Sequence, residues 1–222
     1  MRQVIGDLLP VALGVAISPV PIIAVILMLL APKAKAASVA FMIGWVLGIT
    51  VVITVTTFLL DPADSSDGGS STTSAVIKIV IGVLAMLLSV GQWRSRPGPG
   101  ETAALPAWMA AIDKVTPLKA AGLGALLSGL NPKNLALCIA GGAIIGGADL
   151  TTNDTIIALI VFIAIASSTV AIPVLAFLVA SERLRGPLDE LRVWLTANNA
   201  TVMSVLLLVI GVAILGKGIG GL

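Results

Sequence analysis

The sequence predicts an all-α membrane protein with six transmembrane helices in two inverted three-helix repeats, whose first and fourth helices are broken. Three observations predict this fold class. Apolar residues occur in runs close to the roughly 20 residues that cross a bilayer. The loops between the runs alternate in charge, and helix breakers stand at matching places in the two halves. We therefore expect residues 1–222 to form a single transmembrane domain.

The composition is incompatible with a soluble domain. Hydrophobic residues make up 58% of the chain and charged residues 11%, and the mean hydropathy is +1.11. Soluble domains carry about 25% charged residues, so this chain has too little polar surface to cover itself in water. The net charge of +2 is too small to indicate a nucleic-acid partner.

Reactive residue types are scarce. The chain has one cysteine, Cys138, and no histidine. A disulfide framework and a cysteine metal site are thereby excluded, and the commonest metal ligand is missing. The sequence also contains no nucleophile–base pair, metal-ligand set or nucleotide-binding loop. We expect no cofactor, no metal site, no catalytic residues and no enzymatic activity.

Six apolar runs are predicted to cross the membrane. They cover roughly residues 5–30, 37–60, 75–93, 118–145, 155–180 and 199–217. The first run follows an N-terminus without a basic region or a small-residue cleavage site. We therefore interpret it as a retained helix rather than a signal peptide.

The loop charges predict the orientation. Basic residues occur in 31–36, 94–117 and 181–198, whereas 61–74 and 146–154 contain aspartates and no basic residue. Because basic loops face the cytoplasm, both termini are predicted to lie outside the cytoplasm of a bacterial inner membrane. Two of the basic segments also contain short apolar helix faces, one within 94–117 and one at 182–197. Each is interpreted either as an interfacial helix or as a structured linker.

An internal repeat relates the two halves. The string from Leu13 to Ser18 aligns with that from Leu123 to Ser128 at a shift of 110 residues, and helix breakers follow in both copies. We take 1–93 and 118–222 as the repeats, joined by the linker 94–117. Three spans separate the copies, so the halves must be inverted, and a transporter built this way binds its substrate near the midplane.

The second break contains the polar residues that favour a binding site. It includes Ser128, Asn131, Pro132, Lys133 and Asn134, near the middle of an apolar run. A cation at membrane depth costs about 2.5–3.5 kcal/mol on insertion scales. One interpretation is that Lys133 and backbone N–H groups at the restarting helix hold an anionic substrate group. The other is that the lysine extends to a headgroup or pairs with carbonyls of a neighbouring helix.

The first break, at Ser18, Pro19 and Pro21, is predicted to be the partner half of this site. The alternative is a kinked helix without a ligand, since transmembrane helices tolerate proline.

A third polar break is predicted in the fifth span, where small hydroxyl residues favour helix packing over ligand contact. It comprises Ser167, Ser168, Thr169 and Pro173.

No Asp or Glu lies in the middle of a span. Transporters of metal cations or protons usually need such carboxylates. Their absence argues against cation transport, and Lys133 favours an anion or an anionic headgroup.

These features resemble the lysine-exporter superfamily, and within it the GAP family of sulfolipid-addressing and glycopeptidolipid-addressing proteins of mycobacteria. The resemblance is carried mainly by residues 126–137 with their Asn-Pro-Lys segment, and also by 140–142, 17–23 and 41–45.

The resemblance implies movement of a cell-envelope glycolipid, or of another anionic or amphiphilic small molecule, across the inner membrane of an actinobacterium. Two alternatives remain: an exporter of amino acids or other small metabolites, and a non-transporting scaffold for envelope-lipid synthesis or export proteins. Expected partners are membrane lipids and the substrate, and a homo-oligomer is left open.

Overall fold

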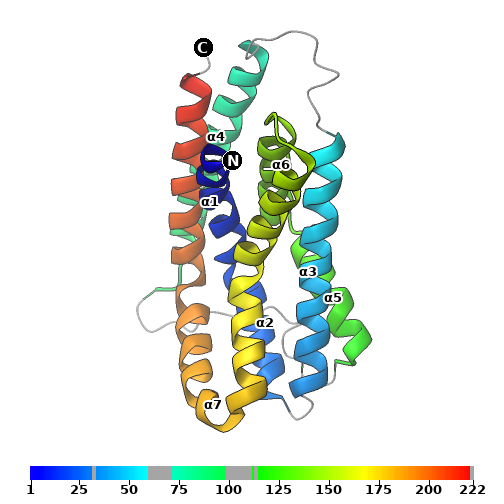
Figure 1. Cartoon of the computed structure of the whole chain (residues 1–222). Coiled ribbons are helices and arrows are strands. Elements are labelled where there is room, and N and C mark those ends of the chain that lie inside the picture. The colour runs from blue at the N-terminus through cyan, green and yellow to red at the C-terminus, as the bar shows by residue number, and fades with distance from the viewer. Residues whose placement is uncertain (32–33, 60–71, 99–111, 113–114, 221–222) are drawn as a thin grey trace. The chain divides into compact units, whose positions relative to one another are not determined.

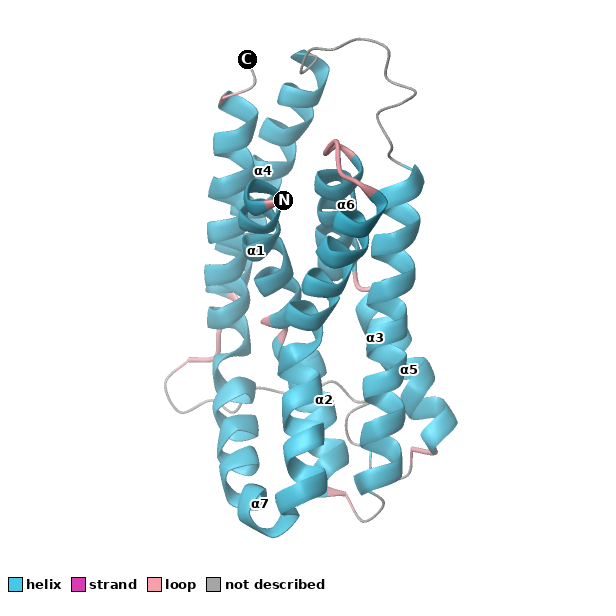
Figure 2. Cartoon of the chain, in the orientation of Figure 1, coloured by secondary structure: helices cyan, strands magenta, loops and turns pink. Residues whose placement is uncertain are grey.

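The computed structural model describes residues 1–31, 34–59, 72–98, 112 and 115–220. All secondary structure in these residues is helical (Figure 2). Seven helices are present there: α1 (Arg2–Ala16), α2 (Pro19–Leu30), α3 (Ala34–Leu59), α4 (Thr72–Arg94), α5 (Pro117–Gly129), α6 (Pro132–Gly146) and α7 (Thr152–Ile219). Most of the predicted acidic loop 61–74 and of the predicted interfacial helix in 94–117 lies outside the described residues.

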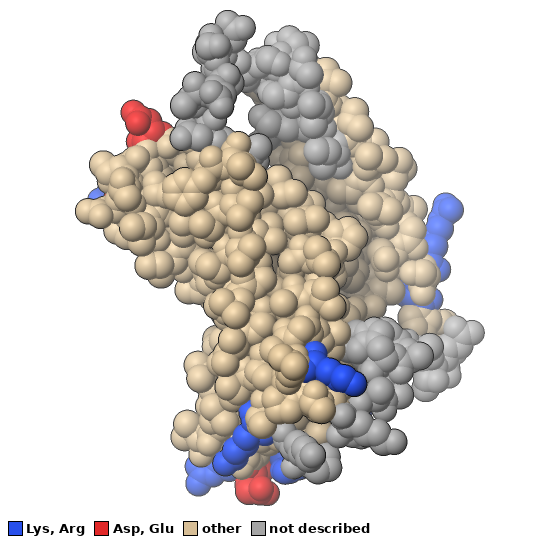
Figure 3. Space-filling view, turned by 90° about the vertical axis from the view of Figure 1, so that its right-hand side faces the viewer, with Lys and Arg blue, Asp and Glu red and all other residues tan. Residues whose placement is uncertain are grey.

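The helices are those of a membrane protein. By length and composition, α3 and the Thr152–Gly216 part of α7 can each cross a membrane, and α1 with α2 forms a third candidate bent by 53°. On the face shown in Figure 3, most atoms belong to uncharged residues.

The chain divides into two compact units. Unit 1 comprises Met1–Pro62 and Ala104–Leu195, and unit 2 comprises Ala63–Ala103 and Thr196–Leu222. The units do not coincide with the predicted repeats 1–93 and 118–222, which remain a prediction.

Helix α3 of unit 1 packs closely along α5, because glycines line the contact. A Cβ atom on Gly44 would overlap the carbonyl of Ala121, and one on Gly124 would overlap that of Phe41. Small residues four apart let transmembrane backbones approach in this way. The two helices run parallel, since close pairs along them rise together in number: Gly44 with Ala121, Gly48 with Ala125 and Gly129 with Val52.

Helix α6 continues along α3 beyond the break. The Thr56 hydroxyl of α3 donates to the Cys138 carbonyl of α6 at 3.4 Å, and a Cβ on Gly142 would overlap the Thr56 side chain. One straight helix therefore supports both pieces of the broken α5–α6 pair.

Helix α2 is buried on almost every side. Its fully buried residues include Ala24, Val25, Ile26, Met28 and Leu29. Such a helix has no polar face to turn toward water, which is typical of the centre of a bundle. The break before α2 is therefore held inside unit 1.

Helix α7 contains one residue with non-helical backbone angles, Ala180 (φ −136°, ψ 48°). Beyond it the ribbon reverses direction (Figure 1), and Arg185 lies over the Phe177 ring at 5.9 Å. Residues 167–173 stay helical, so the prediction of a third break there was wrong. The Ser168 hydroxyl bonds back to Ile165 O at 2.7 Å, and a proline such as Pro173 is tolerated inside a packed transmembrane helix.

Unit 2 is an antiparallel pair formed by α4 and the last part of α7. Ser89 and Ser204 exchange hydrogen bonds, each hydroxyl donating to the other residue's carbonyl at 2.8 Å. Gly82 and Gly211 lie so close that a Cβ on either would stand 2.9 Å from the other's carbonyl oxygen. Small buried residues repeat every seven positions on both helices: Ala75, Gly82 and Ser89 on α4, and Ser204, Gly211 and Gly218 on α7.

Candidate substrate site at two helix breaks

Two short breaks of the same construction interrupt unit 1. Ile17 and Ser18 separate α1 from α2, and Leu130 and Asn131 separate α5 from α6. Each restarting helix has proline in its first position. The prolines that follow the two breaks therefore lie 132 − 19 = 113 residues apart. This is three more than the shift of 110 obtained by aligning Leu13–Ser18 with Leu123–Ser128. Ser18 is the structural counterpart of Asn131 rather than of Ser128.

Lys133 joins the second break to the first. Its Nζ donates to the carbonyl of Gly14 at 2.7 Å and to that of Ile17 at 3.3 Å. Both acceptors lie at the C-terminal end of α1, where the last carbonyls of a helix lack intrahelical partners. The helix dipole also places negative charge at that end, so a cation is stabilised there. Of the two interpretations of Lys133, its contacts in this structure match pairing with a neighbouring helix.

Helix α7 supplies a second polar contact at the same helix end. The Thr169 hydroxyl donates to Ala16 O at 2.6 Å, and the Ser18 N–H donates to the same oxygen at 2.9 Å. Thr169 thus packs helix against helix, as the sequence analysis favoured for this group. Residues from α6 and α7 therefore bond to three carbonyls at the end of α1, those of Gly14, Ala16 and Ile17.

The second break is capped locally. The Asn131 side-chain oxygen accepts from Lys133 N at 3.1 Å, which is the usual cap of a helix N-terminus. The Asn134 amide donates to Leu127 O of α5 at 3.0 Å. Residues next to the break therefore bond to both helix ends, Asn131 to an N–H of α6 and Asn134 to a carbonyl of α5.

The restarting helices offer few backbone donors to an anion. Pro19 and Pro21 have no N–H, so α2 has one unpaired first-turn N–H, that of Val20, in the described structure. At α6, Pro132 has none and Lys133 N is held by Asn131. Few backbone N–H groups are therefore available to bind an anion, and any anion site here depends mainly on the lysine ammonium.

The predicted site residues fall into two groups. Ser18, Pro19 and Pro21 are buried, and they adjoin the carbonyls held by Lys133. Asn131 and Asn134 flank that lysine on α6. Ser128 is fully buried, donates to Ala125 O at 3.2 Å and packs against Gly48 of α3, while Pro132 is exposed.

Three buried polar atoms of unit 1 have no hydrogen-bond partner in the described part of the chain: Trp45 Nε1, Asn134 Oδ1 and Ser167 Oγ. Sequence reasoning missed Trp45. The available signal was an indole N–H in the middle of an apolar span, because a buried Trp N–H usually finds a partner.

A family model of Sap, the sulfolipid-1-addressing protein, matches residues 8–220. The chain belongs to this family. The membership agrees with the sulfolipid-addressing resemblance of the Asn-Pro-Lys segment, whereas the wider relation to the lysine-exporter superfamily stays a prediction. No curated protein and no solved structure is significantly similar to the chain.

Proposed function

We propose that the protein is a transporter that exports a lipid with an anionic headgroup, such as a cell-envelope glycolipid, across a bacterial inner membrane. One observation carries the proposal: two broken helices are brought together by Lys133, whose ammonium bonds to carbonyls at the C-terminal end of α1. Broken helices around a polar group at membrane depth are how many transporters build a substrate site. The family's name supports a lipid substrate.

The proposed architecture is six spans in two inverted repeats. The matching breaks at a shift of 113 residues support it, and so does the Ser89–Ser204 pair of α4 and α7 at a similar shift, 204 − 89 = 115. Helix α7 has 68 residues, about 100 Å at 1.5 Å per residue. A hydrocarbon core is about 30 Å thick, which supports two crossings divided near Ala180.

In the proposed mechanism the substrate competes with the helix end for Lys133. An ammonium has three N–H donors, and two hold Gly14 O and Ile17 O. An anionic headgroup takes the third donor first and then draws the ammonium away from the carbonyls. Substrate binding is thereby coupled to a change of angle between α1 and α2, which would gate the site on one side.

The test is a comparison of envelope lipids and secreted metabolites with and without the gene. A lipid that accumulates inside without the gene, and returns outside with the parent chain but not with Lys133→Met, supports the proposal. Lys119→Met, at an exposed lysine of α5, serves as the matched control and should restore export. Accumulation of an amino acid would favour the metabolite exporter instead. Full restoration by Lys133→Met would contradict the assigned site.

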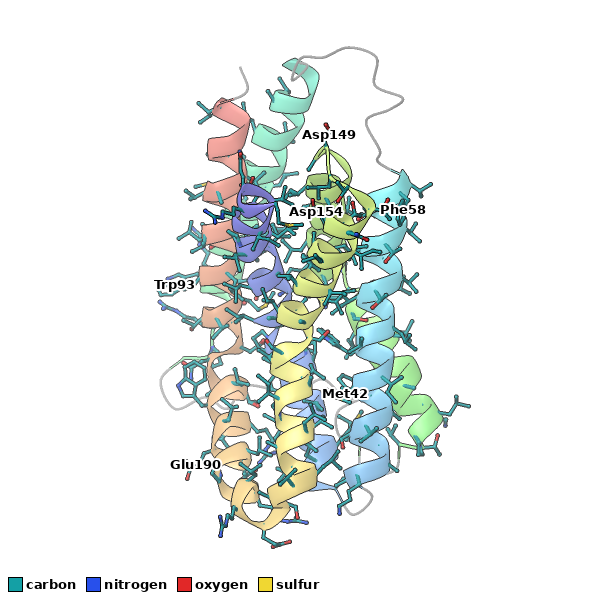
Figure 4. The ribbon with its side chains drawn as sticks, viewed as in Figure 1. Met42, Phe58, Trp93, Asp149, Asp154 and Glu190 are labelled. Atoms are coloured by element: carbon teal, nitrogen blue, oxygen red, sulfur yellow. The ribbon has the colours of Figure 1, made fainter. Side chains whose placement is uncertain are left out.

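The orientation has its own test, because Asp149 and Glu190 lie toward opposite ends of unit 1 (Figure 4). We expect Asp149→Cys to react in intact cells with a maleimide that cannot cross the membrane. Arg183→Cys, in the same segment as Glu190, should react only after lysis. The native Cys138 is buried, so its background labelling is low. The opposite pattern would invert the assigned topology.

A further inference from the structure

The end of α1 has the chemistry of a cation site. The carbonyl oxygens of Gly14 and Ile17 converge on one nitrogen atom, at 2.7 and 3.3 Å. Carbonyl oxygens are the ligands that hard cations prefer. In transporters with broken helices, unwound carbonyls and helix C-terminal ends hold the coupling ion.

We propose that these carbonyls form a monovalent-cation site that the protein fills with its own ammonium, that of Lys133, so that no bound sodium ion is required. The proposal rests on the transport function proposed above, because only a transporter needs a coupling cation. It goes beyond that function by assigning the ion position and the source of the positive charge.

The charges around the site favour a single positive charge. Asp7 of α1 is seven residues before Gly14, about 10 Å along the helix, and Asp154 of α7 is fifteen residues before Thr169, about 22 Å. Helices α2, α3, α5 and α6 contain no Asp or Glu. Besides Lys133, their cations are Lys35, near the start of α3, and Lys119, near the start of α5. The site offers carbonyl and helix dipoles but no carboxylate to neutralise a second positive charge. It therefore suits one ammonium and not a divalent ion.

A third carbonyl at the same helix end also takes a side-chain donor. The Thr169 hydroxyl of α7 donates to Ala16 O at 2.6 Å. The end of α1 therefore presents three carbonyl oxygens that bond to side chains of other helices, those of Gly14, Ala16 and Ile17, and Lys133 supplies the charge-bearing donor.

The experiment removes the Lys133 ammonium by substitution and supplies small cations in solution. Full-length protein in lipid nanodiscs is prepared as the parent chain and as Lys133→Ala, Lys133→Met and Lys119→Ala. Each Tm is measured in 0.1 M choline, sodium, ammonium or methylammonium chloride. We expect Lys133→Ala to melt roughly 3–12 °C below the parent in choline, because two charge-assisted hydrogen bonds are lost and relief of the buried charge offsets about half of that loss. Ammonium or methylammonium should restore at least half of that loss.

The variants separate this result from general salt effects. Lys133→Met should also be destabilised but not restored, because its side chain fills the space that the free cation needs. The parent and Lys119→Ala should melt alike in all four salts. A parent chain stabilised by sodium relative to choline would overturn the proposal, since the ion would then bind elsewhere. Equal melting of Lys133→Ala in every salt would overturn it too.

Should Lys133→Ala not fold, the parent-chain measurement alone decides the sodium question. Lys133→Ser, whose short side chain also leaves the space of the ammonium open, then replaces Lys133→Ala with the same expectation of rescue. No substrate is present in these measurements. Failure of the envelope-lipid comparison would therefore leave the cation result standing, and failure of the rescue would leave lipid export standing.

Discussion

The two helix breaks of unit 1 have the same construction and are stabilised in different ways. Both are two residues long and both are followed by proline. The second is capped by its neighbours, through Asn131 and Asn134. The first has no side-chain cap at Ser18, and the end of α1 depends on Lys133 and Thr169 from other helices. A break held by distant residues responds to their movement, so the first break is the one suited to gating.

Lys133→Met should have the largest effect of the changes that test this comparison. It leaves Gly14 O and Ile17 O without their donor. The unpaired carbonyl of the buried Gly14 costs about 1–3 kcal/mol, and the bond lost at the exposed Ile17 adds less, because water can replace it. Relief of the buried charge offsets part of this, so we expect a net loss of about 2 kcal/mol. Hydrogen exchange should increase in residues 14–20 and stay unchanged in 130–135. Equal protection of both breaks would show that α1 does not depend on the lysine.

The two breaks of unit 1 could be predicted from the sequence, because prolines stand beside polar residues inside long apolar runs there. Proline alone does not mark a break, since Pro10, Pro173 and Pro187 lie inside helices. The partner of Lys133 could not be predicted. Nothing in the sequence specifies which of the carbonyls near membrane depth meets an ammonium more than 110 residues away. The alignment of Leu13–Ser18 with Leu123–Ser128 pairs Ser18 with Ser128. In the structure, the residue directly before the proline of a restarting helix is Ser18 in the first break and Asn131 in the second.

Packing was predicted less well than helix positions. The seven-residue spacing of small residues on α4 and on the end of α7 was present in the sequence, but their pairing depends on where two distant segments meet. The error at 167–173 has a different cause. A proline near hydroxyl residues resembles a break in sequence, yet residues 167–173 stay helical, since a packed transmembrane helix tolerates proline.

Asn131→Ala should have an intermediate effect and should act on the second break alone. Loss of an N-cap costs typically about 1 kcal/mol. Hydrogen exchange should rise in 130–136 and not in 14–20, the reverse of the Lys133→Met pattern. Asn131→Ser keeps a capping oxygen and should restore most of the protection. Increased exchange at both breaks would mean that the second break supports the first through more than the lysine side chain.

Ser18→Ala should have the smallest effect on stability, and this is what makes it informative about function. Ser18 holds the position in the first break that Asn131 holds in the second, but its side chain makes no capping hydrogen bond. Removing the hydroxyl therefore leaves every described contact of the break in place, and we expect a change in unfolding free energy within about 0.5 kcal/mol. Ser18 nevertheless adjoins Ile17, whose carbonyl Lys133 holds, so a headgroup drawn to the lysine would reach this hydroxyl. A fall in lipid export at unchanged Tm would identify Ser18 as a substrate contact. Unchanged export would limit the binding site to Lys133 and the residues of α6, and the first break would then serve to move rather than to bind.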